Sequence, residues 1–212
     1  MKKVISILIF LVLFYVLPLS VKPELLMYPK VIFLAAICTV LFATQPRFSI
    51  TESKQKFSSD KNTVWLILIV SGFGQITSLM EWAYFRQSLP DFSTWTIIGA
   101  IMLIAGTVFR LHAIKVLGKY FSATVQIKDE HRIISQGPYS VLRHPSYTGA
   151  YIAMLGCAVF LHSFIGILIF GVGMLYVYHK RIRAEENTLT EQFKQEYVLY
   201  SKRTFKMFPY IW

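Results

Sequence analysis

The stretch YTGAYIAMLGCAVFLHSFIGILIFGVGMLYVY, residues 147–178, decides the fold. It contains no charged residue, and it is longer than the roughly 20 apolar residues that a helix needs to cross a bilayer. The polar pair His162-Ser163 interrupts it near its middle. We therefore predict two helices of about 16 residues, each roughly 24 Å long, in a tight hairpin. A hairpin returns its ends to the same face of the membrane, so the polar segments on either side of it can meet.

Four apolar runs precede this hairpin, at residues 4–19, 31–43, 63–82 and 95–109. The first run follows Lys2 and Lys3 like the core of a signal peptide, but no small-residue cleavage site follows, so we predict an uncleaved span. Hydrophobic residues make up 55% of the chain and charged residues 16%, whereas soluble domains carry about 25% charged residues. We expect an all-α, polytopic membrane protein with about six transmembrane helices, forming a single membrane domain over residues 1–212.

Basic residues are distributed unevenly between the loops. The loop after the second run, the segment after the fourth run and the tail hold most of them: Arg47, Lys54, Lys56, Lys61, Arg110, Lys115, Lys119, Lys128, Arg132, Arg143, Lys180, Arg181, Arg183, Lys194, Lys202, Arg203 and Lys206. The opposite loops hold only Lys22, Lys30 and Arg86. Six spans with both termini cytoplasmic place every basic loop inside. The net charge of +11 then reflects topology and anionic lipid head groups, and we expect no nucleic-acid partner.

The two cysteines, Cys38 and Cys157, lie inside apolar runs and have no CxxC spacing. Such cysteines are typical of small buried residues in a membrane protein. We therefore predict neither a disulfide framework nor a bound metal.

The segment before the hairpin, QIKDEHRIISQGPYSVLRHPSYTG (residues 126–149), is rich in polar groups. Gly137-Pro138 is typical of a turn, and Pro145 suits the first turn of a helix. The free N–H groups of that helix start, together with Arg143 and His144, favour an anionic group such as a carboxylate. The alternative is that Arg143 and His144 only anchor the membrane interface.

The segment after the hairpin, RIRAEENTL (residues 181–189), has Arg181 and Glu185 four residues apart, and Arg183 and Glu186 three apart. Each pair can share a helix face, so simple salt bridges are one interpretation. Adjacent carboxylates just beyond a membrane span are costly unless they face a polar cavity. Glu185 or Glu186 could therefore hold a cationic ligand group, such as an ammonium or a sulfonium.

Together these segments resemble the isoprenylcysteine carboxyl methyltransferases and their phospholipid-methyltransferase relatives. The resemblance covers about residues 115–210, where the family pattern stands as His131, Gly137-Pro138-Tyr139, RHPSYTG (residues 143–149), Glu185-Glu186 and FKQEY (residues 193–197). Two positions depart from it: Lys194 replaces a frequent glycine, and His162-Ser163 replaces a frequent Asn-Pro turn.

The resemblance implies S-adenosylmethionine as methyl donor, bound without a Rossmann domain in a cytoplasm-facing pocket. It implies that Arg181 faces the acceptor and its carboxylate, that Arg181 and Glu185 are the catalytic residues, and that a lipid-open tunnel admits a lipophilic acceptor. Residues 115–212 would form the methyltransferase core, and residues 1–114 would shape the acceptor site. The implied cofactor-binding residues are Gln126, His131, Arg132, Ile133, Ile134, Gly137, Tyr139, Arg143, His144, Pro145, Ser146, Tyr147, Glu185 and Glu186.

We therefore expect carboxyl O-methylation of a prenylcysteine-like substrate. An ionised carboxylate needs no general base, so the protein has mainly to align the reactants and exclude water. Three other functions stay open: a phospholipid amine N-methyltransferase, a sterol-reductase-like oxidoreductase that uses nicotinamide, and a lipid-binding or transport protein without enzymatic activity.

Overall fold

Residues 147–178 fold as the predicted hairpin in the computed structural model, which describes residues 2–45, 61–86, 92–121 and 133–210. Helix α5 (Pro145–Phe160) ends before His162, whose positive φ of 54° turns the chain. Ser163 then caps the next helix by accepting a hydrogen bond from the N–H of Gly166 at 2.8 Å. That helix runs without a break through α6 (Phe164–Leu168), a π-helical turn η8 (Ile169–Gly173) and α7 (Met174–Phe193).

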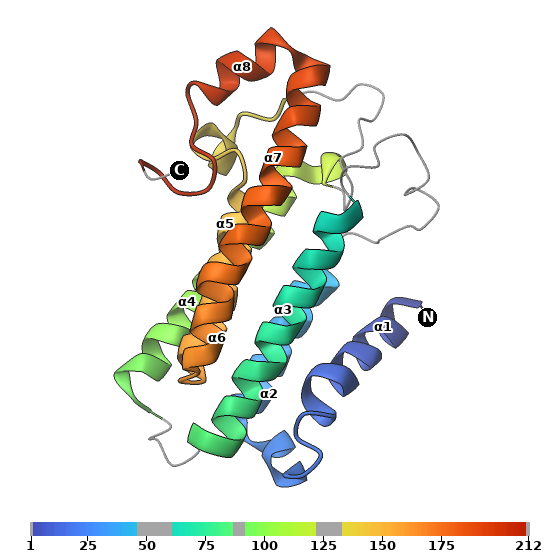
Figure 1. Ribbon diagram of the computed structural model, residues 1–212, viewed down its shortest axis with the longest axis vertical. Coiled ribbons are helices and arrows are strands. Elements are labelled where there is room, and N and C mark those ends of the chain that lie inside the picture. Colours follow the sequence, from blue (N-terminus) through green and yellow to red (C-terminus); the bar gives the residue numbers. More distant parts are fainter. Residues whose placement is uncertain (1, 46–60, 87–91, 122–132, 211–212) are drawn as a thin grey trace.

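The apolar runs before the hairpin are also helical (Figure 1). They form α1 (Lys2–Leu11) with the turn η1 (Val12–Val16), the short 3-10 helix η2 (Pro23–Met27), α2 (Pro29–Ala43), α3 (Lys61–Glu81) with the turn η5 (Trp82–Arg86), and α4 (Thr94–Leu117) with the turn η6 (Gly118–Tyr120). Within the described residues, three continuous helices are long and apolar enough to cross a membrane: Thr63–Arg86, Thr94–Tyr120 and Phe164–Phe193. The α1–η1 and α2 helices are apolar but shorter.

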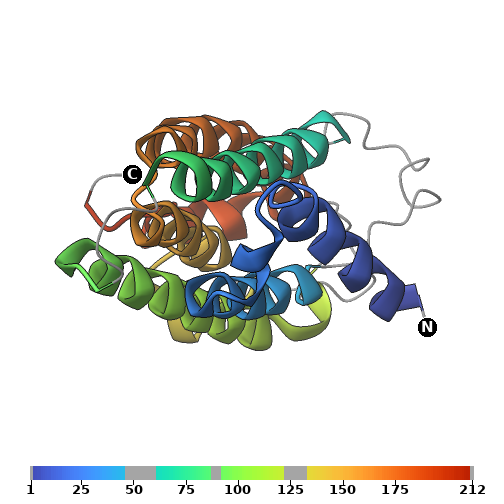
Figure 2. The ribbon, with the colours of Figure 1, turned by 90° about the horizontal axis from the view of Figure 1, so that it is seen from below.

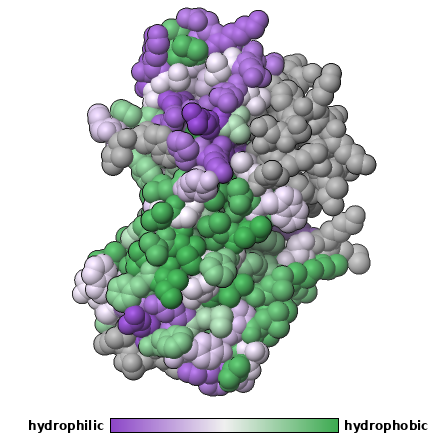
Figure 3. Space-filling view, viewed as in Figure 1, coloured by the Kyte–Doolittle hydropathy of each residue, from purple (hydrophilic) through white to green (hydrophobic). Residues whose placement is uncertain are grey.

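The surface separates into an apolar belt and a hydrophilic end. Figure 3 shows hydrophobic side chains over the middle of the helices and hydrophilic ones at the end that carries α8 (Gln195–Ser201). Large apolar side chains such as Leu8, Ile69, Ile101 and Val172 are exposed on the helices. An exposed apolar belt of this kind suits lipid rather than water.

Helices α4 and α5 pack closely through glycines on both. A Cβ on Gly106 of α4 would lie 2.5 Å from the backbone nitrogen of Ala153, and one on Gly149 of α5 would lie 2.6 Å from the backbone nitrogen of Arg110. Gly99 and Gly156 make equally close contacts further along the two helices. Small residues are the usual means of close helix packing in membranes. Gly149, the last residue of the motif RHPSYTG, thus permits the close approach of α4.

Helix α3 lies beside the α6–α7 helix along the bundle (Figures 1 and 2). Glu81 at its end accepts hydrogen bonds from Ser163 Oγ at 2.6 Å and from the first N–H groups of α6. Near its middle, Gln75 Oε1 accepts from Cys157 Sγ at 3.2 Å, and Cys38 is also buried and free. The Glu81 contacts fix the start of α6 relative to α3, and the Gln75 contact joins α3 to α5.

Candidate functional site

The hairpin brings the start of α5 and the second half of α7 to the same end of the bundle. Arg181 of α7 is only 2% exposed. Its Nε donates hydrogen bonds to Glu185 Oε1 at 2.6 Å and to Tyr147 Oη at 3.2 Å. Its Nη1 donates to Thr63 Oγ1 of α3 at 3.3 Å. The predicted Arg181–Glu185 pair is therefore present, and it is buried rather than solvated.

Tyr147 lies at the centre of this arrangement. Its hydroxyl donates to Glu185 Oε1 at 2.5 Å. Its ring stacks on the imidazole of His144, with centroids 5.7 Å apart, and on the ring of Tyr178 at 4.9 Å. The aromatic stack places the hydroxyl between the arginine and the carboxylate, so it joins α5 to α7.

His144 precedes α5 and contacts both carboxylates of α7. Its Nδ1 lies 3.5 Å from Glu185 Oε2, and its Nε2 lies 3.4 Å from Glu186 Oε1. Burial alone would lower the pKa of His144, but the two carboxylates favour the imidazolium and raise this pKa above its ordinary value. The pair of glutamates thus favours a cation at this position.

Arg143 contacts the second carboxylate. Its Nε donates to Glu186 Oε1 at 2.6 Å, and Lys206 Nζ lies 3.7 Å from Glu186 Oε2. The predicted pairing of Arg183 with Glu186 is wrong: Arg183 is exposed, and Glu186 turns inward to Arg143. The six side chains that these contacts join are called the charged cluster below; they are Arg143, His144, Tyr147, Arg181, Glu185 and Glu186.

The C-terminal segment, residues 201–207, lies across the start of α5. The N–H of Arg143 donates to the carbonyl of Phe205 at 2.8 Å, and the N–H of His144 donates to that of Lys206 at 3.0 Å. Arg143 Nη1 also donates to the carbonyls of Ser201, at 2.9 Å, and Thr204. These backbone contacts hold the segment that carries Arg143 and His144 in a fixed conformation.

Of the other predicted cofactor residues, Gln126, His131 and Arg132 lie outside the described residues. Pro145 and Ser146 are buried in the first turn of α5. Gly137 begins the short 3-10 helix η7 (Gly137–Ser140) with a φ of +59°, a conformation that favours glycine. Ile133 and Ile134 precede it and are half-buried.

Tyr139 of η7 is a candidate ligand contact. It is 5% exposed, and among the described residues its hydroxyl has no hydrogen-bond partner. Burial raises the pKa of Tyr139 well above its ordinary value, so the hydroxyl stays neutral and can donate. A buried hydroxyl without a partner suits a position that a ligand completes.

Sequence reasoning missed two residues beside the site. Arg110 is 3% exposed, and its guanidinium donates to the carbonyl of Ser146 at 2.9 Å and to Gln45 Oε1 at 3.0 Å. It was interpreted as an interfacial charge at the end of the run 95–109, but α4 continues to Leu117 and buries it. Thr63 was counted only as the start of an apolar run; its distance from the motifs along the sequence gave no signal of its contact with Arg181.

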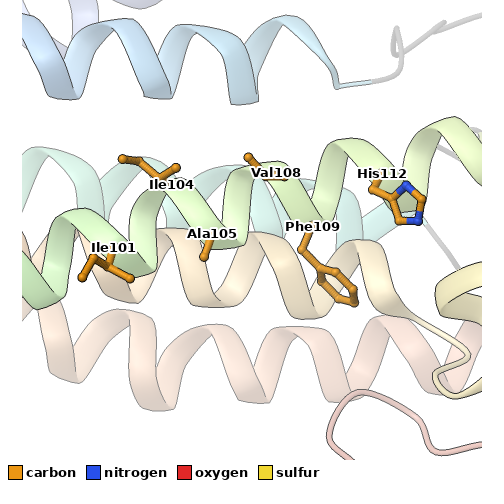
Figure 4. Close-up of a pocket in the computed structure, with 6 residues that line it drawn as sticks. All are labelled: Ile101, Ile104, Ala105, Val108, Phe109 and His112. Carbon is orange, nitrogen blue, oxygen red and sulfur yellow. The ribbon is translucent and has the colours of Figure 1, made fainter.

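A shallow apolar groove of about 540 Å³ lies on the outer side of α4 (Figure 4). Six residues of this one helix line it: Ile101, Ile104, Ala105, Val108, Phe109 and His112. The groove belongs to the apolar belt, and His112 is the polar residue at its end.

Comparison with known proteins places this site in a family. The family model described as the isoprenylcysteine carboxyl methyltransferase (ICMT) family matches residues 98–191. The protein-S-isoprenylcysteine O-methyltransferase of Schizosaccharomyces pombe is 31% identical over 158 residues, which cover 69% of this chain and 67% of that protein. The chain belongs to the isoprenylcysteine carboxyl methyltransferase family. It is accordingly an integral membrane protein.

Other isoprenylcysteine methyltransferases show how far the likeness extends. The enzyme of Dictyostelium discoideum is 34% identical over 132 residues, or 61% of this chain, and the match spans 55% of that protein. The solved structure of a eukaryotic intramembrane Ras methyltransferase ICMT matches 95% of this chain and 74% of its own, with a TM-score of 0.67 and 26% identity. The charged cluster lies entirely within the matched residues 98–191, whereas Thr63 and Lys206 lie outside them.

Proposed function

We propose that the protein transfers a methyl group from S-adenosylmethionine to the carboxylate of a lipophilic, prenylcysteine-like acceptor in the membrane. The observation that carries this proposal is the charged cluster: a buried arginine and two half-buried carboxylates, brought together with residues from both sides of the hairpin. The names of the relatives support the same reaction class.

The residues present fit a sulfonium amino acid. Glu185 and Glu186 offer negative charge for an ammonium or a sulfonium. No side-chain hydrogen bond caps the start of α5. Pro145 has no N–H and that of Tyr147 donates to the carbonyl of His144, so the N–H of Ser146 is the first-turn donor suited to a carboxylate. The partnerless hydroxyl of Tyr139 adds a neutral donor. Bound there, S-adenosylmethionine would supply an electrophilic methyl group.

Arg181 would hold the carboxylate of the acceptor. A guanidinium presents several donors in one plane and can orient a carboxylate bidentately. Its charge is already shared with Glu185, so it would position the nucleophilic oxygen without fully neutralising it. That oxygen would form a bond to the methyl carbon as the carbon–sulfur bond breaks, and the electron pair would stay on sulfur. The products would be a methyl ester and a thioether, without any proton transfer.

The placement of the site agrees with a cytoplasmic orientation. The charged cluster is at the hydrophilic end of the bundle, where the exposed basic residues Lys180, Arg183 and Lys202 also lie. Under the positive-inside rule this end would face the cytoplasm. Residues 115–212 would then form the methyltransferase core, and residues 1–114 would shape the acceptor site.

Methyl transfer from tritiated S-adenosylmethionine into a lipid extract tests the proposal. We expect the label in a product that is hydrolysed by base, because methyl esters are hydrolysed by base. Base-stable label would indicate a methylated amine, and absence of label would refute methyl transfer altogether; nicotinamide oxidation by the same membranes would then indicate a reductase. Arg181→Ala should abolish ester formation, whereas Arg183→Ala, an exposed arginine two residues away, should retain it.

Donor binding tests the role of Glu185 separately. Isothermal calorimetry should show that Glu185→Ala weakens binding of S-adenosylmethionine, because the variant loses a half-buried negative charge beside the proposed donor site. Binding that is as tight as in the wild-type protein would remove Glu185 from the donor site.

A further inference from the structure

Thr63 joins the N-terminal half of the chain to the charged cluster. It lies in the first turn of the helix Thr63–Arg86 and is 7% exposed. It stands outside the residues 98–191 that the family model matches. Its hydroxyl oxygen nevertheless lies 3.3 Å from Nη1 of Arg181, which is 118 residues away along the chain.

The contact acts on a different part of the guanidinium from the other partners. Glu185 and Tyr147 both hold Nε, on one edge of the planar group. Thr63 holds Nη1. Contacts on two different nitrogens constrain the plane of a guanidinium more closely than contacts on Nε do. The Thr63 contact therefore contributes to the direction in which the terminal N–H groups point.

We propose that Thr63 is a positioning residue that sets the orientation of the Arg181 guanidinium toward the acceptor's carboxylate, and this inference rests on the proposed function. A single hydroxyl contributes little to the binding of a buried arginine that already has a carboxylate partner. Its geometric effect is larger, because bidentate recognition of a carboxylate requires a defined plane and a defined edge. Thr63 thereby gives α3 a direct influence on acceptor binding but not on donor binding.

Three variants of the full-length protein, reconstituted in phosphatidylcholine vesicles, test this role. Thr63→Val removes the hydroxyl and keeps the shape, and Thr63→Ser keeps the hydroxyl. Thr107→Val is the matched control: Thr107 is also a buried threonine in a membrane helix, but its hydroxyl bonds only to its own helix, at Leu103, among the described residues. The acceptor is N-acetyl-S-farnesylcysteine, which has one free carboxylate.

We expect Thr63→Val to raise the KM for the acceptor by about tenfold, the effect of losing one hydrogen bond to a charged group. The dissociation constant for S-adenosylmethionine should not change, and the thermal midpoint should fall by only a few degrees. Thr63→Ser should restore the KM to within about twofold of the wild-type value, because its hydroxyl can accept the same bond. Thr107→Val should match the wild-type protein.

The proposal is overturned if Thr63→Val keeps the wild-type KM, or if it raises the acceptor KM and weakens donor binding to the same extent. If Thr63→Val does not fold, Thr63→Ala is measured against Thr63→Ser with the same criteria. The proposed function fails independently, when the wild-type protein transfers no methyl group to this acceptor. If the wild-type protein is active and Thr63→Val keeps its acceptor KM, only the positioning role is refuted.

Discussion

Replacing Glu185 by glutamine removes the counter-ion of a guanidinium that is 2% exposed. The side chain keeps its size and an oxygen to which Tyr147 can still donate, but the 2.6 Å hydrogen bond from Arg181 no longer ends on a negative charge. Leaving one member of a buried ion pair unpaired costs about 3–5 kcal/mol. For a chain of this size each kcal/mol lowers the thermal midpoint by about 2–4 °C. We therefore expect a midpoint about 6–20 °C below that of the wild-type protein.

Thermal unfolding of the detergent-purified protein without donor measures this shift. Glu191→Gln serves as the control, because Glu191 is an exposed carboxylate on the same helix. The double variant Arg181→Met with Glu185→Leu removes both charges, so it should recover most of the loss, since apolar groups can replace a buried ion pair at little cost. A Glu185→Gln midpoint equal to that of Glu191→Gln would refute the reasoning. So would a double variant no more stable than the single one.

Three further predictions concern stability. Gly106→Ala should lower the thermal midpoint because its Cβ meets the backbone of α5 at 2.5 Å, whereas Gly171→Ala, with nothing within 4 Å, should not; equal midpoints would contradict the packing. Glu81→Ala should lower the midpoint by about 5 °C through loss of the charged cap on α6, and an unchanged midpoint would show that the cap adds nothing. Because the pKa of His144 is raised in the folded protein, its stabilising effect is present below about pH 6.5 and is lost as the pH rises through the folded-state pKa. His144→Gln should flatten this fall in the midpoint, and parallel pH profiles would contradict it.

Local spacing made the hairpin and its ion pair predictable. The apolar stretch and its polar interruption indicated two antiparallel helices, and the four-residue spacing of Arg181 and Glu185 placed both on one helix face. The same rule failed for Arg183 and Glu186, because spacing says which side chains are neighbours but not which face is buried. Arg143 lies on the buried side and provides a partner for Glu186 at 2.6 Å. Arg143 is 43 residues from Glu186 in the sequence, and only the tertiary structure brings the two together.

The contacts between α4 and α5 were only partly predictable. Gly149 is the last residue of the motif RHPSYTG, whereas Gly99 and Gly106 looked like ordinary small residues of an apolar run. Their role depends on the facing glycines of α5, which follow the same seven-residue separation. The full extent of α4 was missed for a related reason: apolar composition ends near residue 109, but burial against α5 lets the helix continue past Arg110.

Sequence patterns describe the packing of the N-terminal half least well, because lipid and protein interior are similarly apolar. An apolar run therefore predicts a span but not its neighbours. Polar residues inside such a run do carry this information, since each needs a partner away from water. On α3, Ser71 and Ser78 bond to carbonyls of their own helix. Thr63, Gln75 and Glu81 contact the hairpin instead, at Arg181, at Cys157 and at Ser163. These contacts lie at the start, middle and end of the helix. Helix α3 is thus bound to the hairpin along its whole length, and for that reason a change in α3 can reach the charged cluster.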